Sequence, residues 1–188
     1  MKKALLISEI LGDFLLPLLG FLFWGWDLYF ILLFIIFDLS VRLISAFFRP
    51  ESRQLQLLLR PVLFYLTFLI ISHFYIVLTE PTWRFESAFS AFFWYEDFFI
   101  PQGLILIPLL IYTERSRQRM EQMLHGSYNA VLHLKKLGAR LLASSIIFML
   151  MSICLALFAW SETAEIIFFL SAWLLLIISE NKAAFLKD

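Results

Sequence analysis

The sequence has few charged residues, and this scarcity excludes most soluble architectures. Only 16% of its 188 residues are charged, against roughly 25% in soluble domains, and 62% are hydrophobic. The mean hydropathy is +0.86. The core of one soluble domain cannot hide this much apolar surface, so we expect the bilayer to be the solvent for most of the chain.

Cysteine, net charge and catalytic motifs are limited as well. The single cysteine, Cys154, excludes a disulfide framework and any multi-cysteine metal or iron–sulfur site. The 15 basic and 15 acidic residues give no net charge, whereas a nucleic-acid partner needs a clustered basic face. No hydrolase, zinc-protease or phosphate-loop motif occurs. We therefore expect no enzyme, no metal site and no nucleic-acid partner.

Long apolar segments dominate what is present. A transmembrane helix needs about 20 mostly apolar residues. Six segments meet or approach this length: 4–24, 28–48, 61–78, 98–112, 141–160 and 166–179. The fourth is the weakest, because it is short and contains Pro101 and Pro108. The predicted fold class is all-α, with residues 1–188 forming a single integral membrane domain, a polytopic bundle of six transmembrane helices.

The distribution of basic residues predicts the orientation of this bundle. With six spans and the N-terminus inside, thirteen Lys and Arg residues of the loops and tails lie inside and one, Arg84, lies outside. Cytoplasmic loops carry such an excess of cations. We therefore expect both termini to be cytoplasmic, in a prokaryotic plasma membrane.

Two connecting segments have distinct compositions. The outer loop 79–97 is rich in aromatic residues, which favour the headgroup layer, so we expect it at the outer interface. The inner loop 114–140 is basic and reads as an extension of the fourth helix, a break at Gly126-Ser127, and a second helix entering the fifth span. Its cations would bind anionic lipid headgroups.

Ionisable residues within the apolar segments are the strongest candidates for a site. Charged groups at bilayer depth are costly, and they normally face protein or water. Glu9 and Asp13 are four residues apart on the first helix, and Asp38 and Arg42 are four apart on the second. In a hairpin centred on Gly25-Trp26, Asp13 is level with Asp38, and Glu9 is level with Arg42.

Facing stripes would place three acids beside one base. Two carboxylates close together in a poor dielectric favour a shared proton or a bound cation, which describes a proton or ion site. The structural alternative is a buried ionic lock, in which Arg42 pairs with Glu9 and Asp38 while Asp13 is protonated. Both interpretations remain open at this point.

His73 in the third span is a further candidate. It could relay protons to the acids, or it could ligate a haem iron or a chlorophyll magnesium axially. The simpler interpretation is a histidine bonded to helix backbone, and a haem held by two histidines is disfavoured because His125 and His133 both lie in the inner loop. We therefore expect no cofactor, with His73 as the weak candidate ligand.

Two functions from different classes fit these features. The first is an ion- or proton-handling channel or transporter centred on Glu9, Asp13, Asp38 and Arg42, with His73 as a relay. The second is a non-catalytic accessory subunit of a larger membrane complex, with or without pigment, in which the charges lock helices together. Either protein could assemble as a homo-oligomer.

The first hairpin carries a recognisable pattern. It contains P-x-x-G at Pro17 to Gly20, then G-W-D at Gly25 to Asp27, and then an apolar helix with an acid at Asp38. This pattern resembles an uncharacterised family of small polytopic prokaryotic membrane proteins, in which the second helix ends in Y-W-x-E-N. In this sequence Asp38 matches the acid of the Y-W-x-E-N element, and the other residues of that element are not matched. The resemblance implies a polytopic membrane fold and no particular chemistry.

Overall fold

The protein is described by a computed structural model over residues 10–48, 55–79, 84–93, 102–125, 130–157 and 161–180. Every element in these ranges is a helix, which confirms the all-α class for them. A π-helix, η1 (Ile10–Leu15), leads into α2 (Leu16–Trp24), and the others are α3 (Leu28–Phe47), α4 (Leu55–Thr79), α5 (Phe85–Phe93), α6 (Gln102–His125), α7 (Ala130–Leu157) and α8 (Glu162–Glu180).

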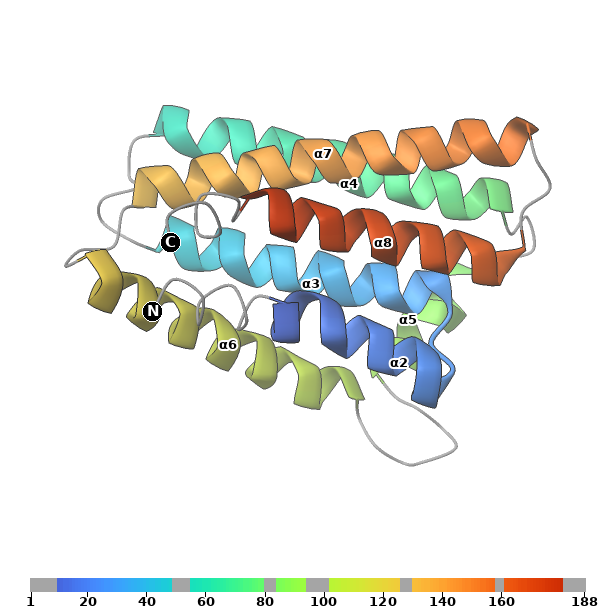
Figure 1. Ribbon diagram of the computed structural model, residues 1–188, viewed down its shortest axis with the longest axis horizontal. Coiled ribbons are helices and arrows are strands. Elements are labelled where there is room, and N and C mark those ends of the chain that lie inside the picture. The colour runs from blue at the N-terminus through green and yellow to red at the C-terminus, as the bar shows by residue number, and fades with distance from the viewer. Residues whose placement is uncertain are drawn as a thin grey trace.

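Six of these helices lie side by side with their axes roughly aligned (Figure 1). Helices α2, α4 and α7 run in one direction, and α3, α6 and α8 run in the other. The short helix α5 lies near the end of the bundle where α2 ends and α3 begins. This alternation matches the order of the six segments predicted from the sequence.

Within the described ranges, four helices are long and apolar enough to cross a membrane. The first is α3. The other three are α4, α7 and α8, which contain the apolar stretches Leu59–Thr79, Leu134–Cys154 and Glu162–Ser179, respectively. The apolar stretch Gly12–Trp24 is shorter, and α6 becomes polar after Tyr112. The protein therefore has the apolar helices of an integral membrane protein, and the count of six spans stays a prediction.

Helix α3 occupies the centre of the bundle. It packs against α2, α4, α5, α6, α7 and α8. Its first nine residues, from Leu28 to Ile36, are all apolar and all buried. A helix that is hydrophobic on every side is typical of a position surrounded by other helices. Because α3 is central, its Asp38 and Arg42, which are one turn apart, also lie in the interior.

The turn between α2 and α3 is fixed by its own sequence. Gly25 has a φ of 62°, a left-handed conformation that favours glycine, and it ends α2. The backbone N–H of Trp26 donates to the Gly20 carbonyl at 3.0 Å, and the Trp26 ring covers Gly20. The Asp27 side chain accepts from the Phe30 backbone N–H at 2.6 Å and caps α3. The P-x-x-G and G-W-D residues thus build the hairpin turn.

Both connecting segments contain helix. The predicted outer loop 79–97 includes α5, whose Phe92 is fully buried and stacks on Phe37 with ring centroids 5.2 Å apart. In the predicted inner loop 114–140, α6 continues to His125 and α7 begins at Ala130. The break predicted at Gly126-Ser127 lies outside the described residues.

Candidate functional site

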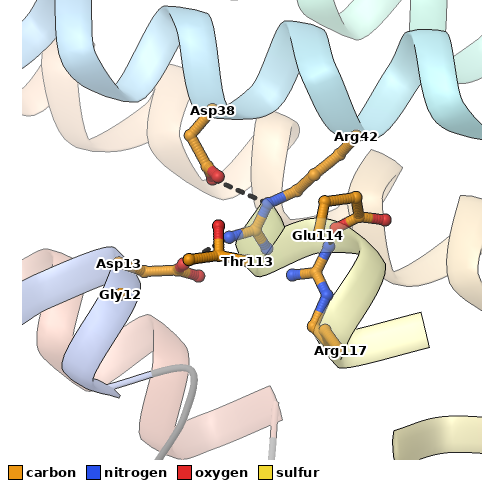
Figure 2. A pocket seen from close by; sticks show the side chains of 7 residues that line it. All are labelled: Gly12, Asp13, Asp38, Arg42, Thr113, Glu114 and Arg117. Atoms are coloured by element: carbon orange, nitrogen blue, oxygen red, sulfur yellow. Dashed lines mark hydrogen bonds and ion pairs between the residues drawn. The ribbon is translucent and has the colours of Figure 1, made fainter. Parts of the chain in front are cut away.

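Arg42 joins the two acidic helices of the hairpin. Its Nε lies 2.6 Å from Asp38 Oδ2, and its Nη2 pairs with Asp13 Oδ1. Figure 2 shows the Arg42 guanidinium between the two carboxylates. Side chains on a helix tilt towards its N-terminus, so Arg42 reaches back one turn to the level of Asp38. The hairpin register predicted Asp13 at that level, and these three residues do meet.

A second arginine completes the group from a distant helix. Arg140 Nη1 on α7 donates to Asp13 Oδ2 at 2.8 Å, so Asp13 is held by arginines of two different helices. All four side chains, Asp13, Asp38, Arg42 and Arg140, are buried. We call these four residues the Asp13 cluster. Its two acids and two bases are formally neutral, in place of the surplus of two negative charges expected for Glu9, Asp13, Asp38 and Arg42.

Arg140 is the site residue that sequence reasoning missed. The prediction counted it with the loop cations, because it stands at the end of the basic segment 114–140. In the structure it is 4% exposed and lies one turn before the buried Ser144. The available signal was its position at the end of the basic segment, since Arg140 is followed at once by the apolar run of the fifth span.

The backbone at Asp13 is also unusual. Asp13 lies in the π-helix, a geometry that often marks functional sites. In an α-helix its carbonyl would accept from residue 17, but that residue is Pro17, which has no N–H. The Trp173 indole Nε1 on α8 donates to this carbonyl at 3.2 Å instead. Helix α8 therefore fixes Asp13 by its main chain while α3 and α7 hold its side chain.

Helix α6 adds a second polar group beside the cluster. Glu114 pairs with Arg117, and Gln118 Nε2 donates to Glu114 Oε1 at 2.6 Å and to Ser45 Oγ on α3 at 2.7 Å. Arg117, like Arg140, was predicted as a loop cation and is buried. The polar half of α6 thus contacts α3 through the Gln118 amide, which also binds Glu114.

A small cavity lies between these two polar groups. Its volume is about 20 Å³, enough for one water molecule. Figure 2 shows the residues that line it, which come from η1, α3 and α6: Gly12, Asp13, Asp38, Arg42, Thr113, Glu114 and Arg117. Six of the seven carry polar side chains, so the cavity suits water or a small ion more than an apolar ligand.

His73 lies apart from the cluster. Its Nδ1 bonds to the Leu69 carbonyl of its own helix at 2.8 Å, and its ring contacts those of Tyr29 and Phe85. Within the described residues it makes no hydrogen bond or ion pair with Asp13, Asp38 or Arg42. Glu9, the remaining candidate, lies outside the described residues.

No family model, curated protein or solved structure matches this chain, and the resemblance of the hairpin motif therefore stays a prediction. Function must be argued from the site itself. What the site offers is two carboxylates and two guanidiniums buried among the helices, next to a polar cavity. Among the described residues no group of three His, Cys, Asp or Glu side chains could hold a metal ion.

Proposed function

We propose that the protein handles protons or small ions across a membrane, and that the Asp13 cluster is its central site. The observation that carries the proposal is the polar cavity that touches Asp13, Asp38 and Arg42. Ionisable groups inside membrane helices face water-filled spaces or one another and commonly mark ion pathways. Here they do both.

The polar half of α6 supplies a route to the cavity from one end of the bundle. Thr113, Glu114 and Arg117 line the cavity, and Arg115 and Arg119 on the same helix are exposed. Towards the opposite end of the bundle, where α3 begins, packed apolar side chains close off the cluster, because Leu28 to Ile36 are all buried. Access from one side at a time is what a transporter requires at its central site.

Asp38 is the acid best placed to exchange its counter-charge. Among the described residues Arg42 is the side chain that pairs with it, whereas Asp13 is held by both Arg42 and Arg140. A proton arriving at Asp38 neutralises that carboxylate, and Arg42 keeps its pairing with Asp13. In this mechanism Asp38 carries the proton, and Asp13 anchors the two arginines.

Flux through reconstituted vesicles tests the proposal. Purified protein in vesicles with a pH gradient should dissipate that gradient, and Asp38→Asn should abolish the flux in a protein that keeps its helical signal, because Asn retains an oxygen that can accept from Arg42. The matched control is Glu86→Gln, which removes an exposed acid from α5 and should leave the flux unchanged. Intact flux in both Asp38→Asn and Asp13→Asn would show that the cluster is not the site.

A second candidate is an accessory subunit of a larger membrane complex, and the charge balance of the cluster favours it. Asp13 and Asp38 face Arg42 and Arg140, and Glu114 faces Arg117, so every charge has a partner. Such a network can fix helix register without titrating. Purification from native membranes with larger subunits or an absorbing pigment, and no flux in vesicles, would favour this candidate.

We also propose that the end of the bundle where α6 ends and α7 begins is cytoplasmic. The cation-rich segments lie where α3 and α6 end and where α4 and α7 begin, and Figure 1 places these helix ends together. An excess of Lys and Arg at one side marks the cytoplasmic face. Reporter tags at the two termini should both respond from the cytoplasm, and tags reporting from opposite sides would contradict the six-span topology.

A further inference from the structure

A larger cavity lies away from the Asp13 cluster, and its lining is almost entirely apolar. It has a volume of about 450 Å³, within the range of roughly 300–1,000 Å³ that is typical of small-molecule sites. Its walls come from α3, α4 and α5, and they include Leu33, Phe37, Leu69 and Phe89. We call it the lateral groove.

The lateral groove opens towards the bilayer. Ile70 lines it and is 70% exposed, and Phe85 lines it and is 47% exposed. In a membrane protein an open apolar groove is filled by hydrocarbon, because neither water nor a vacuum is stable there. The occupant is therefore a membrane-soluble molecule with a long apolar part.

Among the described residues, two polar side chains line the groove, Tyr65 and His73, and the Tyr65 hydroxyl is already bonded to Ser40 Oγ at 2.5 Å. His73 supplies a second hydrogen-bonding position. Its Nδ1 bonds to a carbonyl oxygen, which can only accept, so Nδ1 carries the proton. In the uncharged imidazole Nε2 is then an acceptor, and no described residue donates to it. A ligand whose head donates a hydrogen bond would satisfy this nitrogen. A ligand with only acceptors would not.

The depth of His73 selects a small uncharged head. It lies six residues before the end of α4, about 9 Å below that end along the helix. A phosphate headgroup at this depth would need cationic partners, and the described residues that line the groove include no Lys or Arg. Tyr65, eight residues further from that end, lies about 12 Å deeper and leaves length for a tail.

The walls near His73 are aromatic. The Phe85 ring is 6.0 Å from the imidazole and stacks on Phe89 with centroids 5.3 Å apart. Aromatic heads pack well against such rings. We propose that the lateral groove binds an isoprenoid quinol, whose phenolic hydroxyl donates to His73 Nε2 and whose tail lies along α4 towards Tyr65. This proposal is independent of the function proposed for the Asp13 cluster.

Binding of a short-tailed quinol and of the matching quinone to the protein in nanodiscs tests the proposal. The quinol should bind on the order of tenfold more tightly than the quinone, because a quinone cannot donate to Nε2. His73→Leu should remove this preference. The control Phe74→Leu changes an exposed neighbour that does not line the groove and should preserve it.

A surface variant guards against misfolding of the His73 variant. Ile70→Trp places a large ring at the exposed mouth of the groove and should lower the affinity for the quinol at least tenfold with an unchanged helical signal. Equal affinities of the wild-type protein for quinol and quinone would overturn the proposal. Full quinol affinity in Ile70→Trp, or a tetrapyrrole absorbance in the purified protein, would overturn it too.

Discussion

The two ends of the α2–α3 hairpin are built in opposite ways. At the turn, Trp26 bonds to Gly20 and Asp27 caps Phe30, so the contacts lie within eleven consecutive residues. At the other end, Asp13 is held by groups from α3, α7 and α8, up to 160 residues away along the chain. The turn is therefore a local structure, whereas the contacts of Asp13 exist only when η1, α3, α7 and α8 are all in place.

This difference predicts where the hairpin is most sensitive to substitution. The largest effect is expected for Arg42→Ala, which leaves Asp38 buried without its partner and deprives Asp13 of one of two. Breaking a buried ion pair typically costs about 3–5 kcal/mol. We expect a loss of this size in the free energy of unfolding, measured by titration with dodecyl sulfate in mixed micelles.

Arg115→Ala is the matched control for Arg42→Ala. Arg115 is exposed on α6, so its removal should change the free energy of unfolding by no more than about 0.5 kcal/mol. If both variants unfold at the same detergent fraction as the wild type, Arg42 does not hold the helices together. The ion pairs of the cluster would then have to serve function alone.

The same difference explains how much the sequence could predict. The hairpin register places Asp38 level with Asp13 and Arg42 level with Glu9, because this relation depends on one turn and on regular helices. The predicted ionic lock pairs Arg42 with Glu9 and Asp38, so the contact of Arg42 with Asp13 is a finding of the structure. Arg140 could not be assigned in this way, because its partner is 127 residues away and its sequence neighbours resemble a basic loop. His73 was grouped with the acids only because all of them are ionisable.

The fold likewise has features that could be predicted from the sequence and features that could not. The apolar segments and their alternating directions could be predicted from hydropathy and the cation distribution. The central position of α3 could not, because α4, α7 and α8 also contain apolar stretches long enough to cross a membrane. Its burial depends on which helices pack around it. Likewise, the sequence predicts an interfacial loop where the structure has α5. The position of α5 depends on packing with distant residues, as in the contacts of Phe92 with Phe30 and Phe37.

At the turn, the largest effect is expected for Gly20→Ala. A Cβ at this position would lie 2.2 Å from Cε3 of the Trp26 ring, so the ring and the turn must shift. Overpacking of this kind typically costs about 1–3 kcal/mol. The control is Gly12→Ala, where a Cβ meets nothing within 4 Å. The same unfolding titration should separate the two, and equal losses would mean that Trp26 does not press on Gly20.

The smallest effect is expected at the exposed end of the turn. Asp27→Ala removes the carboxylate that accepts from the Phe30 N–H at 2.6 Å, and the loss of an N-cap typically costs about 1 kcal/mol. Asp27→Asn keeps a capping oxygen without the charge, so it should retain most of the stability. If Asn is as damaging as Ala, the charge of Asp27 matters more than its hydrogen bond. The two ends of the hairpin would then share a dependence on charge, and the contrast between a local turn and an ionic cluster would weaken.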